Sequence, residues 1–102
     1  MNITLICAGG MSTNLLVKNM KEYAAKEGIE GIIKAMSVDS FAEYEGHTDV
    51  LMLGPQIKYR LNEIQERYSN RLKVSVIDMT SYGMLDGKKV VQEAVKLLNT
   101  EL

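Results

Sequence analysis

Residues 3–14 have the sequence Ile3-Thr4-Leu5-Ile6-Cys7-Ala8-Gly9-Gly10-Met11-Ser12-Thr13-Asn14. The apolar run over 3–7 predicts a buried strand, and the pair of glycines after it predicts a tight turn. Ser12 or Thr13 is suited to cap a helix, and Gly28 is suited to end that helix. This stretch therefore predicts a strand that turns directly into a helix, which is the first half of a βαβ unit.

The rest of the chain continues the alternation of strands and helices. Apolar runs predict three further strands over residues 32–36, 49–53 and 74–78. Pro55 is suited to the first turn of a helix, because its missing N–H would have no intrahelical partner there. Asp86 is suited to cap the last helix. Strands that alternate with helices predict a parallel sheet of the α/β class.

Side-chain patterns indicate which faces of the helices are buried. The helix after Pro55 carries an apolar stripe formed by Ile57, Leu61, Ile64 and Tyr68. The last helix is expected to direct inward Val90, Val91, Ala94, Leu97 and Leu98. Phe41 and Tyr59 are expected to lie partly in the core. Glu63 is placed to pair with Arg67, four residues later.

The connections are less regular than the strands. Lys34 favours an edge position for the second strand. The polar segment 37–48 is expected to be a connection with one helical turn near 41–44, and Tyr82 and Gly83 are expected to lie in a loop after the fourth strand.

The apolar character of the strands predicts their order in space. The first and third strands are the most apolar, as expected for strands covered on both faces. Placing them as central neighbours gives an open four-stranded sheet of order 2-1-3-4, flanked by helices, with its switch point between the first and third strands. Ligands of such sheets bind beyond the carboxyl ends of the strands. Cys7 ends the first strand, so it lies at this rim together with Gln56, Asp78 and Tyr82.

Composition excludes several classes of function. The chain has 102 residues, a formal net charge of −1, one cysteine and one histidine. We therefore expect one domain over residues 1–102, no nucleic-acid partner, no disulfide framework, no metal site and no cofactor. The first apolar run is too short for a signal peptide, and no run is long enough to span a bilayer. We expect a cytoplasmic protein without direct membrane insertion, and a monomer.

The loop after Cys7 is suited to hold an oxyanion. Its backbone N–H groups and the helix N-terminus attract negative charge, and glycines allow close approach of the backbone. The same field makes the sulfur of Cys7 a better nucleophile. Neither a Walker motif nor a dinucleotide fingerprint is present. From these residues alone, a small buried cysteine before a tight turn remains the alternative.

The loop Cys7-Ala8-Gly9-Gly10-Met11-Ser12-Thr13-Asn14 resembles the phosphorylation loop of the IIB components of the bacterial phosphoenolpyruvate-dependent sugar phosphotransferase system, in the lactose/cellobiose/chitobiose family. The resemblance extends over the whole chain, through Leu53-Gly54-Pro55-Gln56, Val76-Ile77-Asp78, Tyr82-Gly83 and Asp86-Gly87. Gly9, Gly10 and Asn14 vary around the Cys-x-x-Gly-Met-Ser-Thr core. The resemblance implies a fold like that of the low-molecular-weight tyrosine phosphatases.

The resemblance also implies a mechanism. Cys7 would accept a phosphoryl group from a phosphohistidine of the IIA component and pass it to a sugar bound by the membrane-embedded IIC component. The sugar would be a β-linked disaccharide such as cellobiose, chitobiose or lactose. The phosphoryl group would be held by Ala8, Gly9, Gly10, Met11, Ser12, Thr13 and Asn14. The protein would be found transiently at the inner face of the membrane, through IIC.

Two other functions are compatible with parts of this sequence. A low-molecular-weight cysteine phosphatase needs an arginine six residues after its cysteine, where this chain has Thr13, although Asp78 is a candidate for its acid. A non-catalytic module that binds anions or partners would not depend on the thiol. Met11 is either packed under the helix or a contact for IIA and IIC, and Tyr82 either shields the phosphocysteine or packs against the last helix. His47 is expected to be a solvated residue at the opposite end of the sheet.

Overall fold

A four-stranded parallel sheet lies at the centre of the computed structural model, which describes residues 1–7 and 11–99. The strands are β1 (Ile3–Cys7), β2 (Ile33–Ser37), β3 (Val50–Leu53) and β4 (Lys73–Val76). Their order is β2-β1-β3-β4, as predicted, and all three pairings are parallel. The predicted strands are therefore correct to within one or two residues at each end.

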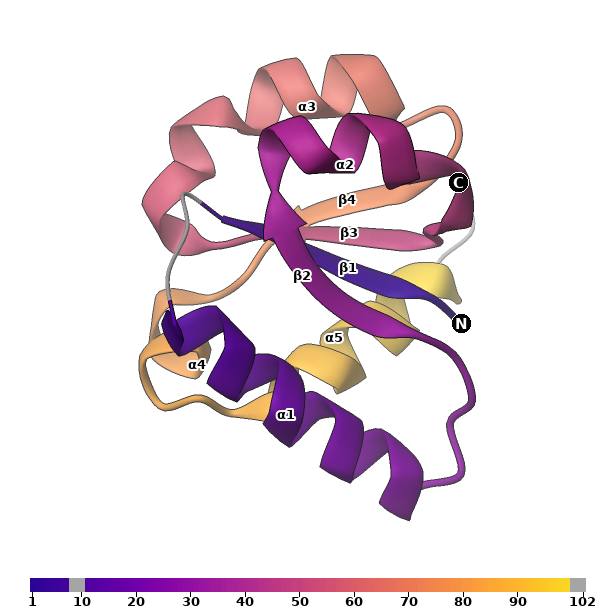
Figure 1. Ribbon diagram of the computed structural model, residues 1–102, viewed down its shortest axis with the longest axis vertical. Coiled ribbons are helices and arrows are strands. Elements are labelled where there is room, and N and C mark those ends of the chain that lie inside the picture. The colour runs from indigo at the N-terminus through magenta and orange to yellow at the C-terminus, as the bar shows by residue number, and fades with distance from the viewer. Residues whose placement is uncertain (8–10, 100–102) are drawn as a thin grey trace.

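Helices cover both faces of the sheet (Figure 1). One layer holds α1 (Met11–Lys26), α4 (Met79–Gly83) and α5 (Gly87–Leu98). The other layer holds α2 (Val38–Tyr44) and α3 (Leu61–Tyr68). Two 3-10 helices, η1 (Glu45–His47) and η2 (Pro55–Arg60), complete the connections on either side of β3. The domain is thus a small α/β sandwich of three layers.

Each face of the sheet has its own apolar core. Leu5, Met52 and Val91 belong to the core under α1 and α5, whereas Ile6 and Leu53 belong to the core under α2 and α3. Every residue of β1 and β3 is buried. This burial explains why the two most apolar strands occupy the centre and why β2, which carries an exposed Lys34, lies at an edge.

The predicted ends of α1 are correct at one terminus only. Gly28 follows the helix with a φ of +71°, a left-handed conformation that glycine adopts without a steric penalty. At the other terminus the helix already begins at Met11. Ser12 and Thr13 therefore lie inside its first turn, and neither occupies the capping position predicted for it.

Several connections are more helical than predicted. Segment 37–48 contains a full helix, α2, because the hydroxyl of Ser37 accepts from the N–H of Ser40 and caps it. The helix after Pro55 is divided, since Ile57 has non-helical angles and α3 begins only at Leu61. The predicted loop around Tyr82 is the short helix α4.

Three predicted side-chain placements are wrong, those of Tyr59, Leu98 and Glu63. Tyr59 is 79% exposed and Leu98 is 36% exposed, although both were expected to lie at least partly in the core. Glu63 pairs with Arg60, with a distance of 2.7 Å from Nε to Oε1, and not with Arg67. Phe41 lies in the core, as expected, and is fully buried. Its ring meets the Tyr68 ring edge to face, with the centroids 5.1 Å apart.

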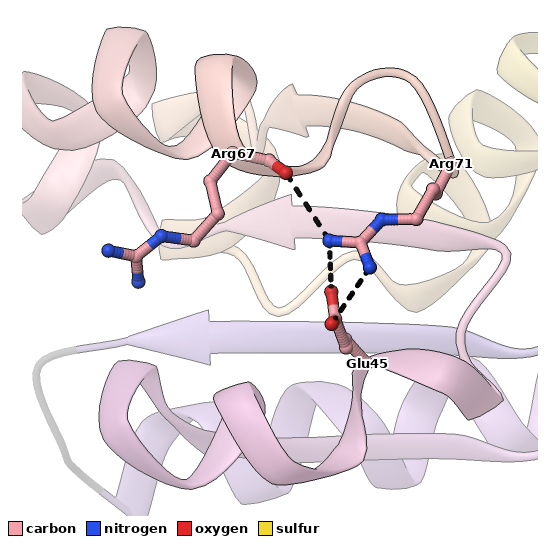
Figure 2. A network of polar contacts seen from close by, with 3 residues as sticks. All are labelled: Glu45, Arg67 and Arg71. Atoms are coloured by element: carbon pink, nitrogen blue, oxygen red, sulfur yellow. Dashed lines mark hydrogen bonds and ion pairs between the residues drawn. The ribbon is translucent and has the colours of Figure 1, made fainter.

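An ion pair joins two connections at the amino end of the sheet (Figure 2). The Arg71 guanidinium lies 2.8 Å from Oε2 of Glu45 and donates to Oε1 at 3.0 Å. It also donates to the carbonyl oxygen of Arg67 and lies over the Tyr68 ring, 5.8 Å from its centroid. This contact fastens η1 to the turn between α3 and β4, at the end of the sheet opposite to Cys7.

Candidate functional site

Cys7 lies at the switch point of the sheet, as the strand order predicted. It is the last residue of β1, lies in register with Ser37 of β2, and is 8% exposed. On its other side the N–H of Gly54 donates to the carbonyl oxygen of Ile6 at 2.9 Å, which continues the β1–β3 ladder by one step. Cys7 therefore lies between the carboxyl ends of β2 and β3.

Gly54 brings the backbone of β3 close to the cysteine. A Cβ atom placed on Gly54 would lie 3.5 Å from the Cβ of Cys7 and 3.0 Å from Oε1 of Gln56. The Gln56 side chain therefore folds back over Gly54, although the residue as a whole is exposed. Gln56 was predicted at the rim, and its amide lies there.

Thr13 and Tyr82 meet beside the first turn of α1. The Thr13 and Tyr82 hydroxyl oxygens are 2.9 Å apart, close enough for a hydrogen bond in which either can be the donor. Thr13 is 2% exposed, and Tyr82 is half-buried against the α1/α5 core. Figure 1 shows α4, which carries Tyr82, next to the amino end of α1. Tyr82 thus contacts α1. It had been predicted either to shield the phosphocysteine or to pack against the last helix, and a contact with α1 was not predicted.

Asp78 has a structural partner of its own. Its Oδ2 accepts from the N–H of Ser81 at 3.0 Å and from the hydroxyl of Ser81 at 3.3 Å. Asp78 is therefore the N-cap of α4, two residues beyond the end of β4. This cap orients the segment that carries Tyr82, and it engages Oδ2 of the Asp78 carboxylate.

The loop itself lies partly outside the described residues. Ala8, Gly9 and Gly10 fall outside them, as do the side chains of Met11 and Ser12, so the predicted contacts of these five residues stay predictions. The backbone of α1 is helical from Met11 onward, and Asn14 is exposed.

Charge at this end of the domain favours an anion. The first turn of α1 contains no acidic residue that would offset the partial positive charge of the helix N-terminus. The first N–H groups of a helix also have no intrahelical acceptors. Cys7 ends β1 four residues before this positive end of α1.

One residue beside Cys7 was not among the predicted site residues. Ser37 is the register partner of Cys7 and is exposed. The signal for it was present, because Ser37 and Ser40 have the spacing of a helix cap after an apolar strand. His47, by contrast, lies where it was predicted, exposed in η1 at the amino end of β3.

Comparison with known proteins identifies relatives along nearly the whole chain. The family model described as "PTS system, Lactose/Cellobiose specific IIB subunit" matches residues 2–93. An oligo-beta-mannoside-specific EIIB component from Bacillus subtilis (strain 168) is 42% identical over 97 residues, which cover 94% of each chain. A galactose-specific EIIB component from Lactococcus lactis subsp. cremoris (strain MG1363) is 39% identical over 103 residues, with 95% of each chain covered.

A solved structure agrees with these matches. The solution structure of a cellobiose-specific phosphotransferase IIB component from Borrelia burgdorferi superposes with a TM-score of 0.80 and 32% identity, over 97% of this chain and 92% of the other. Among residues 1–7 and 11–99, no helix has the length and apolar character needed to cross a membrane. The cysteine at the switch point, the fold around it and these matches together place the chain in the lactose/cellobiose-specific IIB subunit family of the sugar phosphotransferase system.

Proposed function

We propose that Cys7 is the phosphoryl carrier of this IIB component. One observation carries the proposal: the only cysteine of the chain ends β1 and precedes the amino end of α1 by four residues. A sulfur at this place has a positive field beside it and free backbone donors in front of it. Both favour the charge that develops during phosphoryl transfer.

The first step is acceptance from the IIA component. The thiolate sulfur of Cys7 attacks the phosphorus of a phosphohistidine on IIA. The S–P bond forms while the P–N bond breaks, and the imidazole nitrogen keeps the electron pair of that bond. The product is a phosphocysteine on this chain and an unmodified histidine on IIA.

The second step is transfer to a sugar held by the IIC component in the membrane. A hydroxyl oxygen of the sugar attacks the phosphorus, the O–P bond forms and the S–P bond breaks. The proton of that hydroxyl is lost to a base on the IIC side, and the thiolate of Cys7 is regenerated. The chain therefore acts at the inner face of the membrane only while it is bound to IIC, and otherwise in the cytoplasm.

The loop and the first turn of α1 are proposed to hold the phosphoryl group. The backbone N–H groups from Ala8 to Asn14 would donate to its oxygens, with the Ser12 and Thr13 hydroxyls as further donors. Gln56, whose amide oxygen lies over Gly54, would order water or the partner at the rim. Exposed apolar side chains on segments that follow the strands, such as Tyr59 and Met84, would contact IIA or IIC.

The alternative of a cysteine phosphatase has less support. Thr13 stands where the arginine of such an enzyme is needed to grip the phosphate, although Asp78 stays a candidate for its acid. Without that arginine, we expect water attack on the phosphocysteine to be slow. A slow hydrolysis is the property that a carrier needs, because its phosphoryl group must last until IIC is reached.

The sugar is proposed to be selected by IIC. The relatives are named for an oligo-beta-mannoside, galactose and cellobiose, so similar IIB chains work with different sugars. A β-linked disaccharide such as cellobiose, chitobiose or lactose is the proposed class for this chain. A monomer that forms short-lived complexes suits a carrier that serves two partners in turn.

The proposal is tested by intact mass after incubation with a phosphorylated IIA component of the lactose/cellobiose type. We expect one added phosphoryl group on the wild type and none on Cys7→Ser, which changes only the sulfur to an oxygen. Ser37→Ala is the matched control, because Ser37 is the register partner of Cys7, and we expect it to accept normally. A wild type without the adduct, after a quench near neutral pH, would refute the carrier function.

A further inference from the structure

The Tyr82 side chain hydrogen-bonds the first turn of α1 from a distant segment of the chain. Its hydroxyl lies 2.9 Å from that of Thr13, and the two residues are 69 positions apart in the chain. Thr13 is 2% exposed, so water does not compete freely for this contact. A buried hydroxyl pair of this kind fixes the relative position of the two segments that carry it.

The segment that carries Tyr82 is itself held firmly. Asp78 caps its first turn through Ser81, and the N–H of Tyr82 donates to the carbonyl oxygen of Asp78 at 2.9 Å. At its other end, Nδ2 of Asn19 on α1 donates to the carbonyl oxygen of Leu85 at 2.9 Å. Segment 78–87 is therefore hydrogen-bonded to α1 at two positions along the helix, Thr13 and Asn19.

Leu85 shows that this segment is held in an unfavourable conformation. Its φ is +54°, which places a branched side chain in the left-handed region. Such a conformation persists only where neighbouring contacts determine it, and the bonds of Asn19 and Tyr82 to this turn supply them. The turn is thus a rigid support for the amino end of α1.

We propose that Tyr82 is a positioning residue for phosphoryl transfer and acts through Thr13. This inference rests on the proposed carrier function of Cys7. The backbone donors of the first turn of α1 must point at the phosphoryl oxygens, and small displacements of such donors weaken catalysis strongly. Tyr82 holds that turn in place. When its phenol donates to Oγ1 of Thr13, the single proton of the Thr13 hydroxyl is also left for another acceptor.

The test is a double-mutant cycle with Tyr82→Phe and Thr13→Val, measured as single-turnover transfer from a phosphorylated IIA component to the full chain. We expect Tyr82→Phe to lower the rate constant at saturating donor about fivefold, the size expected from one neutral hydrogen bond. We expect Thr13→Val to lower it at least as much, because it also removes a proposed donor to the phosphoryl group. The donor concentration at half-saturation should not change, because the Tyr82 hydroxyl is bonded within the domain. The double variant should be no slower than the slower single variant, and Thr13→Ser, which keeps the hydroxyl, should be faster than Thr13→Val.

Tyr23→Phe is the matched control. Tyr23 also lies on α1, about 15 Å along the helix from Thr13, and its hydroxyl accepts from Nε2 of Gln92 at 3.3 Å. We expect this change to leave the transfer rate unaltered. A Tyr82→Phe variant that transfers at the wild-type rate, or losses that multiply in the double variant, would overturn the positioning role and leave the carrier function intact. Absence of transfer to the wild type would overturn both.

Discussion

Gly54 separates Cys7 from Gln56 at the rim of the sheet. A Cβ atom at this position would be in ordinary contact with the Cβ of Cys7, at 3.5 Å, and would press on Oε1 of Gln56, at 3.0 Å. Its φ of −61° and ψ of 147° are open to any residue, so the need for glycine here is spatial and not conformational. A substitution of Gly54 by alanine therefore tests whether the position of the Gln56 amide matters.

Gly54→Ala is expected to keep the fold and to slow phosphoryl acceptance by Cys7. The new methyl group displaces the flexible end of Gln56, which costs about 1 kcal/mol or less in the free energy of unfolding. Urea unfolding and transfer from phosphorylated IIA measure the two effects. Gly46→Ala is the control, because a Cβ there has no neighbour within 4 Å. An unchanged transfer rate in Gly54→Ala would mean that the Gln56 amide plays no part in the reaction.

Tyr59→Ser is expected to weaken the encounter with a partner without weakening the fold. Tyr59 is 79% exposed on η2, directly after β3, and such aromatic side chains supply much of the binding energy of interfaces. We expect the kcat/KM for transfer from IIA to fall about tenfold, with an unchanged urea midpoint. Ile32→Ser is the matched control, since Ile32 is 49% exposed but precedes β2, at the other end of the sheet. Equal effects of the two changes would exclude a specific contact at Tyr59.

Glu63 is expected to titrate below its usual range. The hydrogen bond from Arg60, aided by the charges of Arg60 and Arg67, lowers the pKa of Glu63 from its ordinary value of 4.5. A lowered pKa in the folded state means that the pair stabilises the domain above the unfolded-state pKa, and that this stabilisation is lost as the pH falls through the folded-state pKa. Because both groups are at the surface, the effect on stability is small.

A carboxyl-carbon NMR titration checks this assignment. Arg60→Gln should return the pKa of Glu63 to near 4.5, whereas Arg67→Gln should raise it less, because only Arg60 donates a hydrogen bond to it. A larger rise in Arg67→Gln would show that the spacing of four residues, and not the observed spacing of three, describes the pair in solution.

Glu45 and Arg71 are expected to show a measurable coupling energy. A cycle with Glu45→Gln and Arg71→Gln should give about 0.5–1 kcal/mol in urea unfolding, the upper range for partly exposed pairs. Arg71→Gln alone should cost more than Glu45→Gln alone, because it also removes the cation from the Tyr68 ring. The coupling should decrease in 1 M salt. Additive losses would show that the contact in Figure 2 contributes no stability.

Gly87→Ala is expected to destabilise the domain by about 2 kcal/mol in urea unfolding. A Cβ on Gly87 would lie 2.4 Å from the carbonyl carbon of Asn19 and from the nitrogen of Met20, both backbone atoms of α1. The two helices would have to move apart, since backbone cannot rotate away as a side chain can. Gly83→Ala, with no neighbour within 4 Å, should change the stability by less than about 1 kcal/mol.

The sequence by itself was sufficient for the strands, their order and the position of Cys7. These features depend on apolar periodicity, on glycine and proline at the ends of elements, and on the right-handed connection of parallel strands. The cap of α5 by Asp86 was also predictable, because a helix cap is a contact over three residues. The helix at 38–44 was underestimated, since short amphipathic segments carry little periodicity.

The contacts of Tyr82 and Gln56 near Cys7 could not be predicted, because they depend on packing between distant segments. The contact of Tyr82 with Thr13 joins residues 69 positions apart, and the fold of Gln56 over Gly54 depends on the space between two strands. The exposure of Tyr59 likewise depends on the break of the helix at Ile57. Elements are encoded by local patterns, but the direction of a side chain depends on which distant segments occupy the space around it, and that is settled when the whole domain packs.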